Sequence, residues 1–138
     1  MIGYVTVGVD DIARAERFYS AFLPDLGYNL DVSDEGLSYA IPVSSDQQHE
    51  TADFYVKSPY DGLAASAGNG TMVAFKVQTQ FLVRKLHAAA IAAGGRNEGA
   101  PGFRAQYGAH FYVGYMRDPQ GNKIALFCNN RNEPKRPD

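Results

Sequence analysis

The sequence predicts an α+β fold made of two copies of one small unit, each with a strand, a helix and further strands. The first observation is an internal repeat: a shift of 68 residues places the alternating apolar residues of 5–9 on those of 73–77, and Gly27 on Gly95. The second is that a helical apolar stripe follows each of these strands. The third is that strand-like runs greatly outnumber the two helices, which is typical of helices packed on one face of a sheet.

The first copy begins with a strand at residues 2–9, where β-branched residues alternate with small or polar ones. Asp10 or Asp11 can cap the helix that follows, and Pro24 and Gly27 end it. The apolar stripe of this helix is Ala15, Phe18, Tyr19 and Phe22. The other elements expected in this copy are strands at 28–32, 37–43 and 52–57, with a polar loop at 44–51.

The second copy follows a small, turn-rich join at residues 58–70 and opens with a strand at 71–77. Thr79 can cap its helix, which the pair Gly94-Gly95 stops. The inward stripe expected for this helix is Leu82, Leu86, Ala89, Ala90 and Ala93. The remaining expectations are loop over much of 96–108, a strand at 109–117, a turn at 118–122 and a closing strand at 123–128.

Each copy is therefore predicted to be a βαβββ module, within a single domain over residues 1–128. The modules span about 1–57 and 71–128. Residues 129–138 have no apolar period and contain Pro134 and Pro137, so we expect a flexible tail there. A chain of 138 residues with 45% hydrophobic residues can bury one full core.

Composition argues against several classes of partner. The net charge of −2 gives no electrostatic footprint for nucleic acid. No apolar run approaches the roughly 20 residues of a membrane helix, and the start of the chain has no basic flank, so we expect a cytoplasmic protein without membrane contacts. The single cysteine, Cys128, excludes an internal disulfide, and its apolar surroundings indicate a core residue rather than a nucleophile.

Two stretches carry a family resemblance. YVTVGVDDIARAERFYSAFLPDLGY at 4–28, followed much later by DPQGNKIALF at 118–127, resembles the glyoxalase / bleomycin-resistance / extradiol-dioxygenase superfamily, also called the vicinal-oxygen-chelate family. The resemblance covers residues 1–128. It implies that the paired modules form a curled, cup-shaped sheet with the helices on its outer face. It also implies that the cup binds a small molecule and that the protein is a homodimer.

The resemblance also marks four positions at which enzymes of the family hold a metal ion, usually with histidine, glutamate or another carboxylate. Carried onto this chain, they are Tyr4, Phe54, Met72 and Ala125, and the second is fixed only to within one residue. Phenylalanine and alanine donate nothing, a thioether suits hard divalent ions poorly, and a neutral phenol binds metal weakly. We therefore expect a degenerate metal site and no metal or other cofactor.

Alternation along the strands names the side chains that face the predicted cup. They are Tyr4, Thr6, Phe54, Val56, Met72, Ala74, Lys76, Ala125 and Phe127. This set is apolar and aromatic, as in many small-molecule pockets, although such side chains can also simply fill the space that a metal once held. Lys76 can bind an anionic group of a ligand or act as a base, or it can lie in water at the rim.

Other candidates lie outside the alternating strands. Arg104 and Tyr107 belong to the glycine-rich loop 99–108, which can cover the pocket. His110 is either a pocket residue or a packing residue, and a metal site formed by His110 with Glu98 or Tyr107 is an alternative that their spacing does not support. His49 and His87 are expected to be solvated or edge histidines.

The function expected from these features is binding of an apolar or aromatic small molecule without metal, as in drug-sequestering resistance proteins. Two alternatives stay open. One is a metal-dependent lyase, isomerase or dioxygenase that uses non-standard ligands. The other is a protein without a ligand whose role is an interaction.

Overall fold

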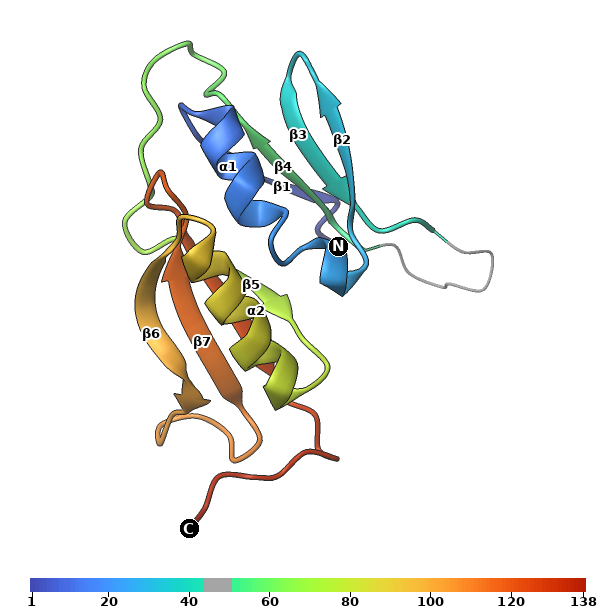
Figure 1. Ribbon diagram of the computed structural model, residues 1–138, viewed down its shortest axis with the longest axis vertical. Helices are drawn as coiled ribbons and strands as arrows, with labels where there is room; N and C mark the ends of the chain where they lie inside the picture. Colours follow the sequence, from blue (N-terminus) through green and yellow to red (C-terminus); the bar gives the residue numbers. More distant parts are fainter. Residues whose placement is uncertain (44–50) are drawn as a thin grey trace.

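The computed structural model describes residues 1–43 and 51–138 and consists of two modules of the same design (Figure 1). The first module contains β1 (Tyr4–Gly8), α1 (Ile12–Tyr19), the short 3-10 helix η1 (Pro24–Leu26), β2 (Asn29–Ser33), β3 (Gly36–Ala40) and β4 (Asp53–Lys57). The second contains β5 (Met72–Lys76), α2 (Gln80–Ala92), β6 (Arg96–Phe103), β7 (Tyr112–Arg117) and β8 (Lys123–Cys128). Residues 44–50, which include His49 and most of the expected loop, lie outside the described part.

The two modules form two four-stranded mixed sheets with matching strand orders, β1-β4-β3-β2 and β5-β8-β7-β6. In each sheet the first and last strands of the module pair in parallel, and the other pairs are antiparallel. Both helices lie on the same side of the sheets (Figure 1). The predicted α+β fold of paired βαβββ modules is therefore confirmed, with two sheets that do not close into a barrel.

Helix starts follow the predicted caps, whereas the buried stripe of α2 differs from the prediction. The Asp11 carboxylate accepts the Arg14 N–H at 3.0 Å, and Thr79 Oγ1 accepts the Leu82 N–H at 3.1 Å. The residues that α2 buries are Gln80, Val83, Leu86, His87 and Ala90. These residues have helical spacing, but they define a face rotated from the predicted stripe toward His87. The packing of α2 on the sheet, rather than the position of its largest apolar residues, decides which face is buried.

An aromatic cluster joins the two modules in one core. Phe75 of β5 packs edge-on against Phe22 and Phe54 of the first module, with ring centroids 6.0 and 5.2 Å apart. Tyr28 packs against Phe75 as well, at 5.9 Å. Because aromatic pairs contribute beyond the area they bury, this cluster fixes how the edges of β1 and β5 approach each other.

The prediction of loop over much of residues 96–108 was wrong, because strand β6 occupies Arg96–Phe103. β6 pairs with β7 but its register shifts between Asn97 and Gly99 and again between Gly99 and Gly102. β6 is the last strand of its sheet, where glycine, proline and bulges are tolerated. Its pairing therefore comes from hydrogen bonds to β7, which no alternation in its own sequence reveals.

The segment after β8 lies against the start of α2 and the loop that precedes β7. The Gln80 N–H donates to Glu133 Oε1 at 2.8 Å, and the Arg136 N–H donates to the Ala109 carbonyl at 2.7 Å. The flexibility of residues 129–138 stays a prediction. Among the described helices, none is long and apolar enough to cross a membrane.

Candidate ligand-binding site

The face of the sheets opposite α1 and α2, here called the open face, presents most of the side chains predicted to line the cup. On β1, Tyr4 and Thr6 are exposed whereas Val7 is buried, and Tyr4 keeps 64% of its surface exposed. On β5, Met72, Ala74 and Lys76 are exposed whereas Phe75 is buried. Period-two alternation therefore placed these five residues on the expected face.

Two residues predicted on this face lie on the other one. Phe54 pairs with Val5 and Val56 pairs with Val7, so both side chains point toward the helices and are buried. The Phe54 ring lies 5.1 Å from that of Tyr19 of α1. The prediction for β4 was off by one residue, and an error of one residue exchanges the two faces of a strand. The open face of β4 instead carries Asp53, Tyr55 and Lys57.

The same register corrects the second of the four metal positions. Tyr55 pairs with Thr6 as Ala125 pairs with Ala74, so Tyr55 is the counterpart of Ala125. Desolvation and the 3.2 Å hydrogen bond to the Asp53 carboxylate raise the pKa of the Tyr55 phenol, which keeps it protonated at neutral pH. A protonated phenol is a poor metal ligand.

The four positions are thus Tyr4, Tyr55, Met72 and Ala125, and they do not fit a divalent ion. Tyr4 and Tyr55 pack against each other with ring centroids 5.3 Å apart. Residues 1–43 and 51–138 contain no group of three or more His, Cys, Asp or Glu that could hold a metal. We derive no metal-dependent step from this arrangement.

An apolar cavity of about 420 Å³ lies where the two modules meet. It is lined by Ile2, Val5, Tyr28, Phe54 and residues 51–53 and 71–75. Phe54 contributes to it from the core side, so this residue lines a cavity although it does not face the open face as expected. The volume falls within the usual range for small-molecule pockets, roughly 300 to 1,000 Å³.

A second hollow of about 380 Å³, here called the basic hollow, lies on the open face of the second sheet. Its lining residues are Met72, Glu98, Gly99, Arg104, Gln106, Tyr107, Tyr115 and Lys123. The Arg104 guanidinium lies 5.5 Å and the Lys123 ammonium 5.1 Å from the centre of the Tyr115 ring. Both are within the range of cation–π attraction. Met72 lines this hollow and the apolar cavity, so the two are neighbours.

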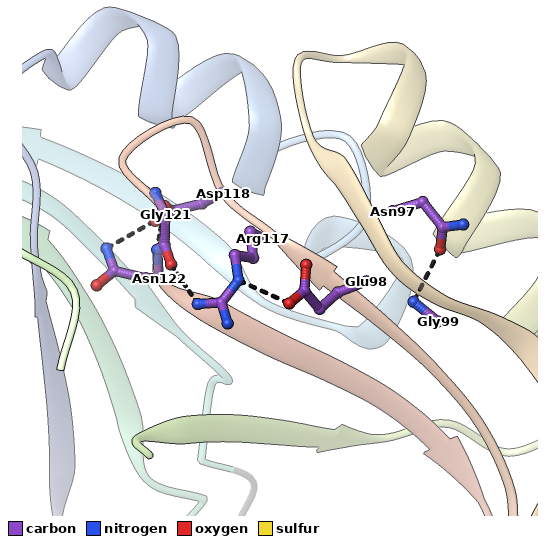
Figure 2. Close-up of polar contacts among 7 residues, drawn as sticks. All are labelled: Asn97, Glu98, Gly99, Arg117, Asp118, Gly121 and Asn122. Atoms are coloured by element: carbon purple, nitrogen blue, oxygen red, sulfur yellow. Dashed lines mark hydrogen bonds and ion pairs between the residues drawn. The ribbon is translucent and has the colours of Figure 1, made fainter. Parts of the chain in front are cut away.

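Arg117 on β7 contacts both the neighbouring strand β6 and the turn that follows β7 (Figure 2). Its Nε lies 3.1 Å from Glu98 Oε1, and its Nη1 donates to the Gly121 carbonyl at 2.8 Å. On β6 the Gly99 N–H donates to the Asn97 side chain at 3.0 Å. Glu98, the acid of the basic hollow, therefore has its own cationic partner.

Sequence reasoning missed Tyr115, Lys123 and Arg117, although a signal was present. All three occupy alternate positions of β7 and β8, and Tyr115 pairs with Ala125, which was predicted to face the cup. The alternation that puts Ala125 on the open face puts Tyr115 there as well, because the two residues are paired. Arg104, predicted in the covering loop, follows β6 and lines the basic hollow.

The remaining predicted residues lie elsewhere. Lys76 is exposed and lines a separate hollow with Gln78, Thr79, Asn129 and Asn130. Lys76 does not line the basic hollow. Phe127 stacks on Phe111, with ring centroids 5.5 Å apart.

Neither of the two described histidines, His87 and His110, lines the basic hollow. His110 does not line the basic hollow with Glu98 and Tyr107, and its buried Nδ1 has no partner within the described residues. His87, expected to be solvated or at an edge, is buried instead, with Nε2 3.0 Å from the Tyr115 carbonyl oxygen. Gly114 makes room for it, because a Cβ there would lie 3.0 Å from the His87 ring.

Comparison with known proteins agrees with this architecture. The sequence profile of the Glyoxalase/Bleomycin resistance protein/Dioxygenase superfamily matches residues 1–126. No curated protein sequence matches the chain. A glyoxalase/bleomycin resistance protein from Albidiferax ferrireducens T118 is 33% identical in sequence, with a TM-score of 0.75 over 93% of this chain and 98% of that one.

Two more distant crystal structures share the fold. A glyoxalase-related enzyme from Fulvimarina pelagi is 19% identical, with a TM-score of 0.67 over 94% of this chain and 88% of that one. A glyoxalase/bleomycin resistance protein/dioxygenase family enzyme from Burkholderia phytofirmans PsJN is 20% identical, with a TM-score of 0.65 over 91% of this chain and 96% of that one.

Proposed function

Because the chain belongs to the Glyoxalase/Bleomycin resistance protein/Dioxygenase superfamily, we propose that it binds a small apolar or aromatic molecule where its two modules meet, without using a metal. The observation that carries this proposal is the apolar cavity of about 420 Å³ between the modules. Its wall combines the aromatic rings of Tyr28, Phe54 and Phe75 with the side chain of Met72. An apolar wall with few polar groups is typical of a site that takes an apolar ligand.

Binding without metal is supported by the side chains at the family's metal positions. A phenol pair, a thioether and a methyl group stand where three or four hard donors would be needed. Atomic absorption of protein purified without chelators tests this part. About one zinc, nickel, iron or manganese ion per chain would favour the alternative, a lyase, isomerase or dioxygenase with other ligands.

The binding itself is tested with a neutral fluorescent probe, N-phenyl-1-naphthylamine. We expect saturable binding, and we expect Met72→Ala to weaken it by about tenfold, because Met72 lines the cavity and its truncation removes contact area without opening the core. Phe81→Ala is the matched control, since Phe81 is an exposed apolar residue on α2. Absence of saturable binding, or equal effects of the two substitutions, would contradict the proposal.

We also propose that two copies of the chain associate through their open faces. Tyr4 and Met72 leave large apolar surfaces exposed there. Light scattering should give twice the 15.1 kDa mass of one chain. A mass of one chain at micromolar concentration would contradict this association.

A further inference from the structure

We propose that the bound molecule carries a carboxylate and that Arg104 and Lys123 bind this group in the basic hollow. This inference rests on the proposed function and narrows its ligand class to apolar or aromatic acids. It is carried by the placement of two cations around one aromatic ring, next to an apolar cavity.

The two cations converge from different elements. Arg104 follows β6, Lys123 begins β8, and Tyr115 on β7 lies between these strands in the sheet. Each charged group lies within 5.5 Å of the centre of the Tyr115 ring. Both side chains also line the basic hollow, so an anion bound in the hollow would offset the repulsion between these two like charges.

The acids nearby do not supply that anion. Within residues 1–43 and 51–138, the ion pairs are Arg117 with Glu98 and Lys85 with Asp25. Glu98, which lines the basic hollow, is therefore already paired, and Arg104 and Lys123 have no carboxylate in the described part of the chain. The chain as a whole is acidic, with a net charge of −2, so this local excess of positive charge belongs to the hollow.

Arg104 is held in place before any ligand binds. Its Nη2 donates to the Ala100 carbonyl at 2.8 Å, and its Nη1 donates to that of Phe103 at 3.2 Å. Arg136 holds the loop in turn, because its Nη1 donates to the carbonyls of Arg104 and Tyr107 at 3.0 and 2.9 Å. A guanidinium has five N–H donors, so Arg104 keeps donors free for a carboxylate. Because its side chain is already held in place, it loses less conformational entropy when a ligand binds.

Tyr115 adds a neutral wall and no negative charge. Burial and the neighbouring Tyr107 raise the pKa of the Tyr115 phenol, although Arg104 lowers it in part. At neutral pH the phenol is therefore protonated, and its ring can stack against a planar ligand.

The position of Met72 indicates that the ligand has an apolar body next to its anionic group. This side chain lines the basic hollow and the apolar cavity, so a molecule anchored at Arg104 and Lys123 extends across Met72 toward the apolar wall. The recognised molecule thus has an anionic end and an apolar body. A sugar acid or a small inorganic anion would leave the apolar wall uncovered.

The test compares 2-naphthoate with its neutral analogue 2-naphthamide by calorimetry at low salt. We expect the acid to bind about tenfold more tightly, because hydrogen bonds to a charged group contribute more than neutral ones. Lys123→Gln and Arg104→Gln should each remove that preference, and added sodium chloride should reduce it. Arg84→Gln is the matched control, since Arg84 on α2 lies 5.8 Å from the Tyr112 ring, away from the hollow.

The outcomes separate this inference from the proposed function. Equal affinity for acid and amide, or a preference that Lys123→Gln leaves intact, would overturn the carboxylate site while binding in the cavity stands. Absence of binding by either naphthyl compound and by the neutral amine probe would overturn both. Lys123→Gln is the decisive variant, because the Lys123 side chain, unlike that of Arg104, donates no hydrogen bond to the loop backbone within the described residues.

Discussion

The Tyr19 hydroxyl of α1 donates a hydrogen bond of 2.6 Å to Asp118 Oδ2 in the turn between β7 and β8. Asp118 is buried, and its Oδ1 accepts the N–H groups of Gln120, Gly121 and Asn122, each at 2.9 Å. Asn122, which also donates to Asp118 (Figure 2), donates to the Gly8 carbonyl of β1 at 2.9 Å. One buried carboxylate therefore shapes a turn of the second module and fastens it to the first.

Tyr19→Phe tests this link between the modules. Removing the hydroxyl leaves Asp118 with one partner fewer in a buried site, so we expect the free energy of unfolding to fall by about 1 to 3 kcal/mol. Urea unfolding measures the loss, and Tyr60→Phe is the control because Tyr60 is fully exposed. A loss no larger than that of Tyr60→Phe would show that the hydrogen bond contributes nothing to stability.

The sequence predicted the two modules, their caps and the turn at 118–122 because these features depend on local residues. Asp118 and Asn122 serve the turn, as residues of this type commonly do. The contact of Asp118 with Tyr19 was not predictable, since it joins residues 99 positions apart. It depends on how the modules pack, which local patterns do not encode.

Alkaline pH should destabilise the protein through its buried tyrosines. Burial and the nearby Glu16 raise the pKa of Tyr39 to about 12, although its hydrogen bond with Ser20 lowers the pKa in part. Burial and the neighbouring Asp118 raise the pKa of Tyr19 well above its ordinary value. In the unfolded chain both phenols ionise near about pH 10. Their contribution to stability is therefore complete below about pH 10 and falls as the pH rises, and that of Tyr39 is lost toward about pH 12.

Urea unfolding at a series of pH values measures this effect. We expect a constant free energy of unfolding between about pH 7 and about pH 9, apart from other groups, and a fall above about pH 10. Tyr39→Phe should reduce the slope of that fall, because phenylalanine does not ionise. An unchanged slope in this variant would mean that Tyr39 does not account for the alkaline loss.

Gly99→Ala should disturb the basic hollow without changing any charge. A Cβ at Gly99 would lie 2.9 Å from Tyr115 Cδ2 and 3.3 Å from Arg104 Nη2, so one of these side chains must move. We expect 2-naphthoate affinity to fall by about tenfold, with a stability loss of about 1 to 3 kcal/mol. Gly108→Ala is the control, because nothing lies within 4 Å of its Cβ position. Equal affinities for the two variants would contradict the proposed geometry.

The candidate site was predicted less completely than the fold. Alternation along its strand predicted Met72 as a lining residue, and the glycine-rich segment 99–108 pointed to Arg104; both line the basic hollow. Phe54 was given the wrong face because the sequence fixes this position only to within one residue, and a shift of one residue reverses a strand. Lys123 and Tyr115 become neighbours of Arg104 only through the pairing of β6, which its own sequence does not indicate.

The corrected register itself can be tested by building the donors that the family's metal enzymes use. In the triple variant Tyr4→His, Tyr55→Glu and Met72→His, two imidazoles and a carboxylate replace groups that bind metal poorly, on open-face positions that are not buried. We expect added Zn²⁺ to raise its melting temperature, with stabilisation of about 2.7 kcal/mol at a hundredfold excess over the dissociation constant, and to leave the parent protein unchanged. The matched control carries Tyr55→Gln in place of Tyr55→Glu, which keeps the side-chain size but removes the charged donor. If the two triple variants respond equally to zinc, Tyr55 does not occupy the fourth-strand metal position and the register argument for β4 is wrong.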